Sequence, residues 1–159
     1  MLSGGVRWIN CWEPVRDAVR AKGGRYGELT KPLVIAVNVD GFSLDRIDEM
    51  QALFGQEEFV FNRANPHGQP DMRRARNGAW NGPKGPQYTR VSAAWLFGEI
   101  SPWNLASPIN TLYLNPWAQI PLPMNLGNVN HAFVNGDEME WFEAANLADL
   151  IGVPESWPE

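Results

Sequence analysis

Basic residues are the side chains of this sequence best suited to bind an anionic polymer. Arg16, Arg20 and Lys22 fall in a segment with helical spacing, where Arg16 and Arg20 lie one turn apart on one face. Guanidinium and ammonium groups bind phosphate oxygens through charge-assisted hydrogen bonds. We expect this group to contact nucleic acid, and the plainer alternative is a solvated helix face.

A second basic group lies in the segment 62–87, which is rich in glycine, proline, asparagine and arginine and holds a single acid. Arg73, Arg74 and Arg76 form the group, and Trp80 offers an indole ring on which a base could stack. Long loops inside compact domains are often functional or mobile. The segment is a second candidate nucleic-acid contact, with a flexible surface loop as the alternative.

Residues of the kinds that catalyse reactions are sparse. His67 and His131 are far apart and have no second ligand at metal spacing, so surface or structural roles are expected for both. Cys11 has no evident histidine partner. Asp40 follows a predicted strand at the edge where open α/β sheets place ligands, which is a hint only. No catalytic residue and no metal ligand is therefore assigned.

The elements that must position these residues centre on the segment 31–41. Six of its seven residues from Leu33 to Val39 are apolar, which predicts a strand buried on both faces and covered by helices. Periodicity predicts helices over 12–23 and 43–54 and an acidic last helix over 137–151. Apolar runs predict strands over 6–9, 58–61, 91–97 and 110–114, the last two antiparallel. We expect one α/β domain, 1–159, with a mixed β-sheet flanked by helices.

Composition bounds the class of protein. The chain has 159 residues, of which 44% are hydrophobic and 19% charged, as in globular proteins. The lone Cys11 excludes an internal disulfide, and no apolar stretch reaches the roughly 20 residues that span a bilayer. We therefore expect a cytoplasmic protein with no membrane partner.

Charge is unevenly distributed along the chain. All 13 lysines and arginines lie at or before Arg90, against 10 acids, so this part sums to +3. From Val91 onward there are 8 acids and no lysine or arginine. One end could approach an anionic partner, and the alternative is an unevenly charged solvated surface.

Several short motifs carry a family resemblance. They are Arg25-Tyr26-Gly27, Lys31 to Asn38, Ala52-Leu53-Phe54-Gly55, Arg90 to Ala93, Asn115-Pro116-Trp117-Ala118 and Pro121-Leu122-Pro123. Together they resemble a group of uncharacterised bacterial proteins whose fold is similar to restriction endonucleases, the PD-(D/E)XK superfamily. The resemblance covers residues 12–123 and leaves 124–159 as an acidic C-terminal helix and tail.

The resemblance implies a Mg²⁺-dependent nuclease, but the catalytic motif is missing. That chemistry needs an acid followed by (Asp/Glu)-x-Lys, so that carboxylates hold the metal and the lysine stabilises developing charge. The lysines are Lys22, Lys31 and Lys84, and none has an acid two positions before it. No cofactor is expected for this chain. Mg²⁺ would be expected only in a longer form of the protein that carries the acids upstream.

Two functions follow as hypotheses. In the first, the chain is the C-terminal part of a restriction-endonuclease-like protein with an incomplete core, and it contacts DNA without its own metal site. In the second, it is a structural domain that forms a homo-oligomer through an exposed strand edge and Trp-rich surfaces. An active nuclease ranks third, because it would need acids from elsewhere.

Overall fold

The computed structural model describes residues 10–39, 44–61, 63–65, 68–106, 109–123, 129–144, 147–154 and 156–157. Its helices are α1 (Trp12–Gly23), α2 (Arg46–Phe54) and α3 (Leu147–Ile151). Its strands are β1 (Leu33–Val39), β2 (Glu57–Val60), β3 (Asp71–Arg74), β4 (Asn81–Gly82), β5 (Gly85–Pro86), β6 (Val91–Gly98), β7 (Ile109–Leu114), β8 (His131–Asn135) and β9 (Glu138–Phe142). None of the helices in these stretches is long and apolar enough to cross a bilayer.

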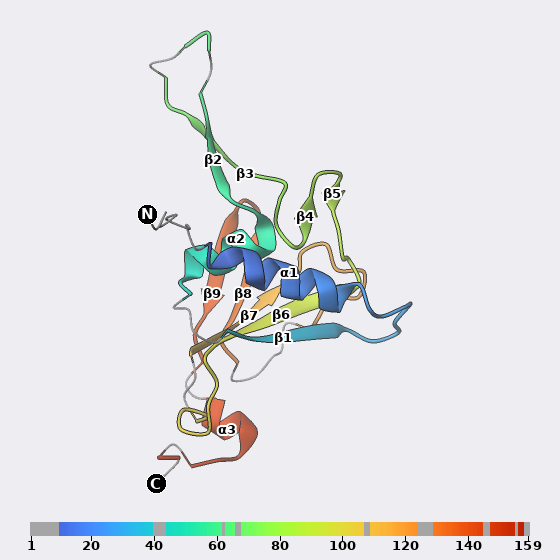
Figure 1. Ribbon diagram of the computed structural model, residues 1–159, viewed down its shortest axis with the longest axis vertical. Helices are drawn as coiled ribbons and strands as arrows, with labels where there is room; N and C mark the ends of the chain where they lie inside the picture. The colour runs from blue at the N-terminus through green and yellow to red at the C-terminus, as the bar shows by residue number, and fades with distance from the viewer. Residues whose placement is uncertain are drawn as a thin grey trace, which may run out of the picture.

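A five-stranded mixed sheet forms the centre of the molecule (Figure 1). Its strand order is β1-β6-β7-β8-β9, with β1 parallel to β6 and β7 parallel to β8. The β6–β7 and β8–β9 pairs are antiparallel. The α/β class and the mixed sheet are therefore confirmed, as is the antiparallel pairing of the strands expected at 91–97 and 110–114.

Two helices cover one face of this sheet and enclose the main core. Val15 and Val19 lie one turn apart on α1 and pack, with Leu53 of α2, in one cluster with Ile35 and Val37 of β1. Leu53 is fully buried, which contributes roughly 2 kcal/mol. The apolar stripe of each helix is thus matched by alternate residues of the strand beneath it.

The expectation that β1 is buried on both faces is wrong. Its burial alternates, with Ile35, Val37 and Val39 buried while Val34 is 38% exposed. Among the described residues, helices cover only one face of this strand, and β1 is an edge strand paired with β6 alone. The sequence misled because an outward position, Val34, is apolar too. The two edge strands of the sheet, as far as the structure describes the chain, are β1 and β9.

The helix expected over 137–151 is also wrong. Residues 131–142 form the hairpin β8–β9, and only Leu147–Ile151 are helical. Gly136, at the turn, has φ 62°, a left-handed conformation that favours glycine. Met139 and Trp141 face the core on alternate positions, which is the period of a strand.

The short strand expected over 58–61 is confirmed as β2, but the segment 62–87, expected to be a loop, contains three further strands, β3, β4 and β5. The strands β2 and β3 form one ribbon, which projects from the body beyond α2, and β4 and β5 form the other (Figure 1). Trp80 is fully buried and packs edge-to-face on Phe54, with ring centroids 5.4 Å apart. It therefore cannot stack on a base, contrary to the expectation. Its large apolar ring anchors this segment to the core.

Three features of the sequence lie outside the described residues. They are the strand expected over 6–9, the carboxylate of Asp40 and the imidazole of His67.

Candidate functional site

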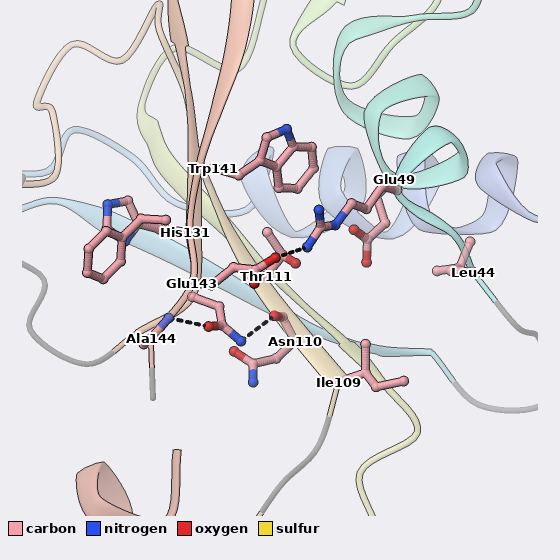
Figure 2. Close-up of a pocket in the computed structure, with 12 residues that line it drawn as sticks. Leu44, Glu49, Ile109, Asn110, Thr111, His131, Trp141, Glu143 and Ala144 are labelled. Carbon is pink, nitrogen blue, oxygen red and sulfur yellow. Dashed lines mark hydrogen bonds and ion pairs between the residues drawn. The ribbon is translucent and has the colours of Figure 1, made fainter. Parts of the chain in front are cut away.

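A pocket of about 310 Å³ opens where the N-terminal part of α2 meets the ends of three strands (Figure 2). Residues before and in α2 form one wall, and residues of β7, β8 and the end of β9 form the others. The lining residues are Leu44, Arg46, Glu49, Ile109, Asn110, Thr111, Asn130, His131, Trp141, Phe142, Glu143 and Ala144. Clefts of this volume are large enough for small ligands.

Glu49 is the buried acid of this pocket. Glu49 is 7% exposed, and its Oε2 accepts a hydrogen bond of 2.6 Å from the hydroxyl of Tyr113 on β7. Burial raises the pKa of Glu49 to about 7, against the lowering effects of that hydrogen bond and of Arg46. Burial and the neighbouring carboxylate also raise the pKa of Tyr113. The carboxyl therefore changes charge near neutral pH.

A cation already lies on the rim of the pocket. The guanidinium of Arg46 lies 4.4 Å from the ring centroid of Trp141, and its Nη2 lies 2.8 Å from Oε1 of Glu143. His131 stacks on Phe142, and its Nδ1 lies 2.9 Å from the carbonyl oxygen of Val129. A carbonyl only accepts, so Nδ1 carries the proton in the neutral ring. His131 thus has a structural role here, as expected.

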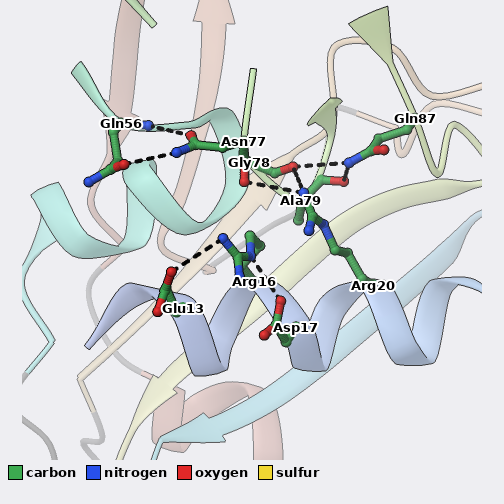
Figure 3. A network of polar contacts seen from close by, with 9 residues as sticks. All are labelled: Glu13, Arg16, Asp17, Arg20, Gln56, Asn77, Gly78, Ala79 and Gln87. Carbon is green, nitrogen blue, oxygen red and sulfur yellow. Dashed lines mark hydrogen bonds and ion pairs between the residues drawn. The ribbon is translucent and has the colours of Figure 1, made fainter. Parts of the chain in front are cut away.

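The predicted arginines of α1 are engaged within the protein (Figure 3). Arg20 donates from Nη2 to the carbonyl oxygens of Asn77 and Gly78, at 3.2 and 2.9 Å. Arg16 contacts Asp17 at 2.8 Å and lies over the ring of Trp12. Lys22, on the same helix, is exposed. Arg20 therefore brings α1 and the basic segment 62–87 together, although 57 residues separate it from Asn77.

The predicted arginines of the segment 62–87 have partners as well. Arg73 pairs with Glu58 at 3.2 Å, and Arg74 pairs with Glu57 at 2.9 Å, across the β2–β3 ribbon. Arg76 is exposed and donates to the carbonyl of Pro83. The six candidates thus lie in two neighbouring regions, α1 and β3 with the residues just after it, and not in one cluster.

The β2–β3 ribbon carries exposed apolar side chains that the sequence analysis missed. Phe59, Phe61 and Met72 are 61%, 62% and 66% exposed, and Phe59 lies opposite Met72 in the pairing register. The alternation of Phe59 and Phe61 along the chain was the available signal. We call the exposed apolar residues of this ribbon, Phe59, Phe61 and Met72, the arm face.

A groove of about 860 Å³ lies at the base of the arm face. Its apolar lining includes Met50, Met139 and Trp117, the last of which is 36% exposed. Asp137 and Glu138 of the β8–β9 hairpin also line it. We call this hollow the arm groove. Methionine-rich, aromatic surfaces of this kind are typical of protein docking sites.

The described residues contain no group of three or more His, Cys, Asp or Glu side chains placed to hold a metal ion. Comparison of the chain with protein-family models, with curated proteins and with solved structures gives no match.

Proposed function

We propose that this protein is a self-associating interaction domain in which the arm face of one copy docks on the arm groove of a second copy. The observation that carries the proposal is that Met72, which lies opposite the exposed Phe59, also lines an open groove with Met50, Trp117 and Met139 in its wall. Single exposed apolar residues are ordinary, but a projecting ribbon beside an apolar groove indicates an interface. An arrangement in which each copy gives an arm and a groove closes as a two-fold dimer.

Charge supports a second copy as the occupant. Ion pairs with Glu57 and Glu58 neutralise Arg74 and Arg73. The remaining charged residues of the ribbon and its flanks are two cations, Arg63 and Arg76, and one acid, Asp71, so the net charge is positive. The groove is lined by the paired Arg73 and Arg74 and also by Asp137 and Glu138, two acids from the part of the chain that has no lysine or arginine. A positive arm and an acidic wall attract each other between copies.

Sedimentation velocity tests this proposal. The wild-type chain should sediment as a concentration-dependent dimer, and the double variant Phe59→Ser with Met72→Ser should sediment as a monomer of unchanged circular dichroism. Val34→Lys is the matched control, because it places a charge on the exposed face of β1 without touching the arm. If the β1 variant abolishes the dimer while the arm variant keeps it, the exposed face of β1 is the interface and the arm proposal is wrong.

Nucleic-acid binding is a second candidate, favoured by one observation. The hydrogen bonds of Arg20 to Asn77 and Gly78 join α1, which carries the exposed Lys22, to the segment that carries the exposed Arg76. Fluorescence anisotropy of labelled DNA at rising salt tests this, because counterion release makes such binding salt-dependent. Loss of binding in the variant Lys22→Ala with Arg76→Ala would support it, and a dimer indifferent to DNA would not.

The restriction-endonuclease-like relationship and the cytoplasmic location stay part of the proposal. What supports the first is the mixed sheet and the order of α1 directly before β1, the edge strand that could accept further strands. If the natural protein has residues before Met1, a chain that includes them, assayed for Mg²⁺-dependent DNA cleavage, would test whether they supply the missing acids.

A further inference from the structure

The pocket beside Glu49 goes beyond the proposed association, because it lies away from the arm face and shares no lining residue with the arm groove. We propose that this pocket binds a small organic cation with N–H donors, an ammonium or guanidinium group, through the carboxyl of Glu49. The inference rests on three observations: a hollow of ligand size, an acid buried in its wall, and a cation already held at its rim.

The placement of the acid is the first step of the argument. Glu49 is 7% exposed, yet its side chain lines an open pocket, so desolvation is costly unless something compensates the charge. The hydroxyl of Tyr113 satisfies Oε2. A cation in the pocket would be met by the second oxygen, Oε1, where a charge-assisted hydrogen bond in a desolvated site is strong.

The charges around the pocket select the sign of the ligand. Of the charged residues that line it, Glu49 and Glu143 are acids, and Arg46 is a cation that is already paired with Glu143. An anion would face this excess of carboxylates, whereas a cation would reduce it. The surroundings therefore favour a positively charged ligand.

The rim shows that these side chains can hold such a group. The guanidinium of Arg46 rests on the ring of Trp141 and contacts Glu143, which is the combination of π-face and carboxylate that binds organic cations (Figure 2). Thr111 and Asn130 add polar groups deeper in the lining. A ligand of a few heavy atoms fits the volume of about 310 Å³.

Binding of a cation should be linked to the charge of Glu49. Because the pKa of Glu49 is raised to about 7, the carboxylate that the cation needs is mostly protonated at pH 6 and mostly ionised at pH 8. We expect affinity to be about tenfold weaker at pH 6 than at pH 8, since the ionised fraction changes by that factor. His131, Arg46 and Glu143 are the other titratable or charged residues that line the pocket, and Tyr113, Asp45 and Asp48 also act on Glu49.

Isothermal titration calorimetry of the full chain with butylguanidinium tests the proposal, with butylurea as the neutral isostere. The cation should bind at pH 8 and butylurea should not. Glu49→Gln should reduce the affinity at least tenfold at pH 8 and remove the pH dependence, whereas His131→Gln should keep it. Equal binding of butylurea, or a pH dependence lost in the His131 variant and kept in the Glu49 variant, would overturn the proposal.

A measurement on the wild-type chain avoids any doubt about folding of the variants. The carboxyl ¹³C resonance of Glu49 reports its pKa directly, and saturating butylguanidinium should lower that pKa by at least one unit. An unchanged pKa would overturn the proposal. A short Gly-Arg-Gly peptide with blocked ends, titrated in the same way, distinguishes two sources of the guanidinium group. Binding of the peptide indicates an arginine side chain of a partner protein. Binding of butylguanidinium without binding of the peptide indicates a free small molecule.

Discussion

Tyr113, on the middle strand of the sheet, donates a hydrogen bond of 2.6 Å to the buried carboxyl of Glu49 on α2. The contact joins residues 64 positions apart and fixes α2 over the sheet. It also places a titratable group in the core, where its ionisation affects both the stability of the fold and the charge of the pocket.

Glu49 should make the stability of the protein depend on pH. Its pKa is raised from 4.5 to about 7 in the fold, so its contribution is complete below pH 4.5 and is lost as pH rises through about 7. The loss is at most about 3 kcal/mol. Glu49→Gln, which keeps an acceptor for Tyr113, should therefore become more stable relative to the wild type between pH 4 and pH 8. Urea unfolding of both proteins at the two pH values measures this, and a constant difference would contradict it.

Arg20 should act as a structural residue. Arg20→Met removes two hydrogen bonds to the carbonyl oxygens of Asn77 and Gly78, and we expect it to lower the free energy of unfolding by about 1–3 kcal/mol. Lys22→Met is the matched control on the same helix, where an exposed side chain should change stability by less than about 0.5 kcal/mol. Chemical denaturation compares the two, and equal effects would show that the carbonyl contacts contribute little.

Gly78 should be intolerant of any side chain. A Cβ at this position would collide with backbone atoms of Leu53, Phe54 and Gly55, which cannot move without displacing the end of α2. Gly78→Ala should cost more than about 3 kcal/mol. Gly27→Ala meets nothing within 4 Å and serves as the control. Thermal unfolding of the two variants decides the point, and similar melting temperatures would show that the backbone relaxes easily here.

The local sequence pattern correctly predicted helices α1 and α2, whose apolar spacing and capping residues match their positions in the fold. The apolar stripe of Val15 and Val19 on α1 is a local feature, and so is the cap of α2, where the carboxylate of Asp45 accepts a hydrogen bond of 2.8 Å from the backbone N–H of Asp48. Both helices were predicted from these features. The hairpin β8–β9 was missed although Asn135-Gly136 is a strong turn signal. Apolar residues at helical spacing later in the segment 137–151 outweighed it.

The sites depend on contacts that no local pattern contains. In the sequence, Glu49 is one polar residue of the helix predicted over 43–54. It becomes a buried acid because Tyr113 approaches it from a strand that is distant in the sequence. Likewise Arg73 was expected to contact nucleic acid, because its pairing with Glu58 requires that β3, which was expected to be part of a loop, pairs with the strand predicted over 58–61. Long-range pairing therefore decides which charged residues remain available to a partner.

Charge reversal tests the central claim most directly, because the claim is that the arm of one copy meets the acidic wall of another. One variant combines Arg63→Glu with Arg76→Glu, and the other combines Asp137→Lys with Glu138→Lys. Each alone should sediment as a monomer, and their equimolar mixture should form a heterodimer, because both contacts of the two-fold pair are then complementary. Dimers of each variant alone, or a mixture that stays monomeric while the wild type associates, would contradict the account.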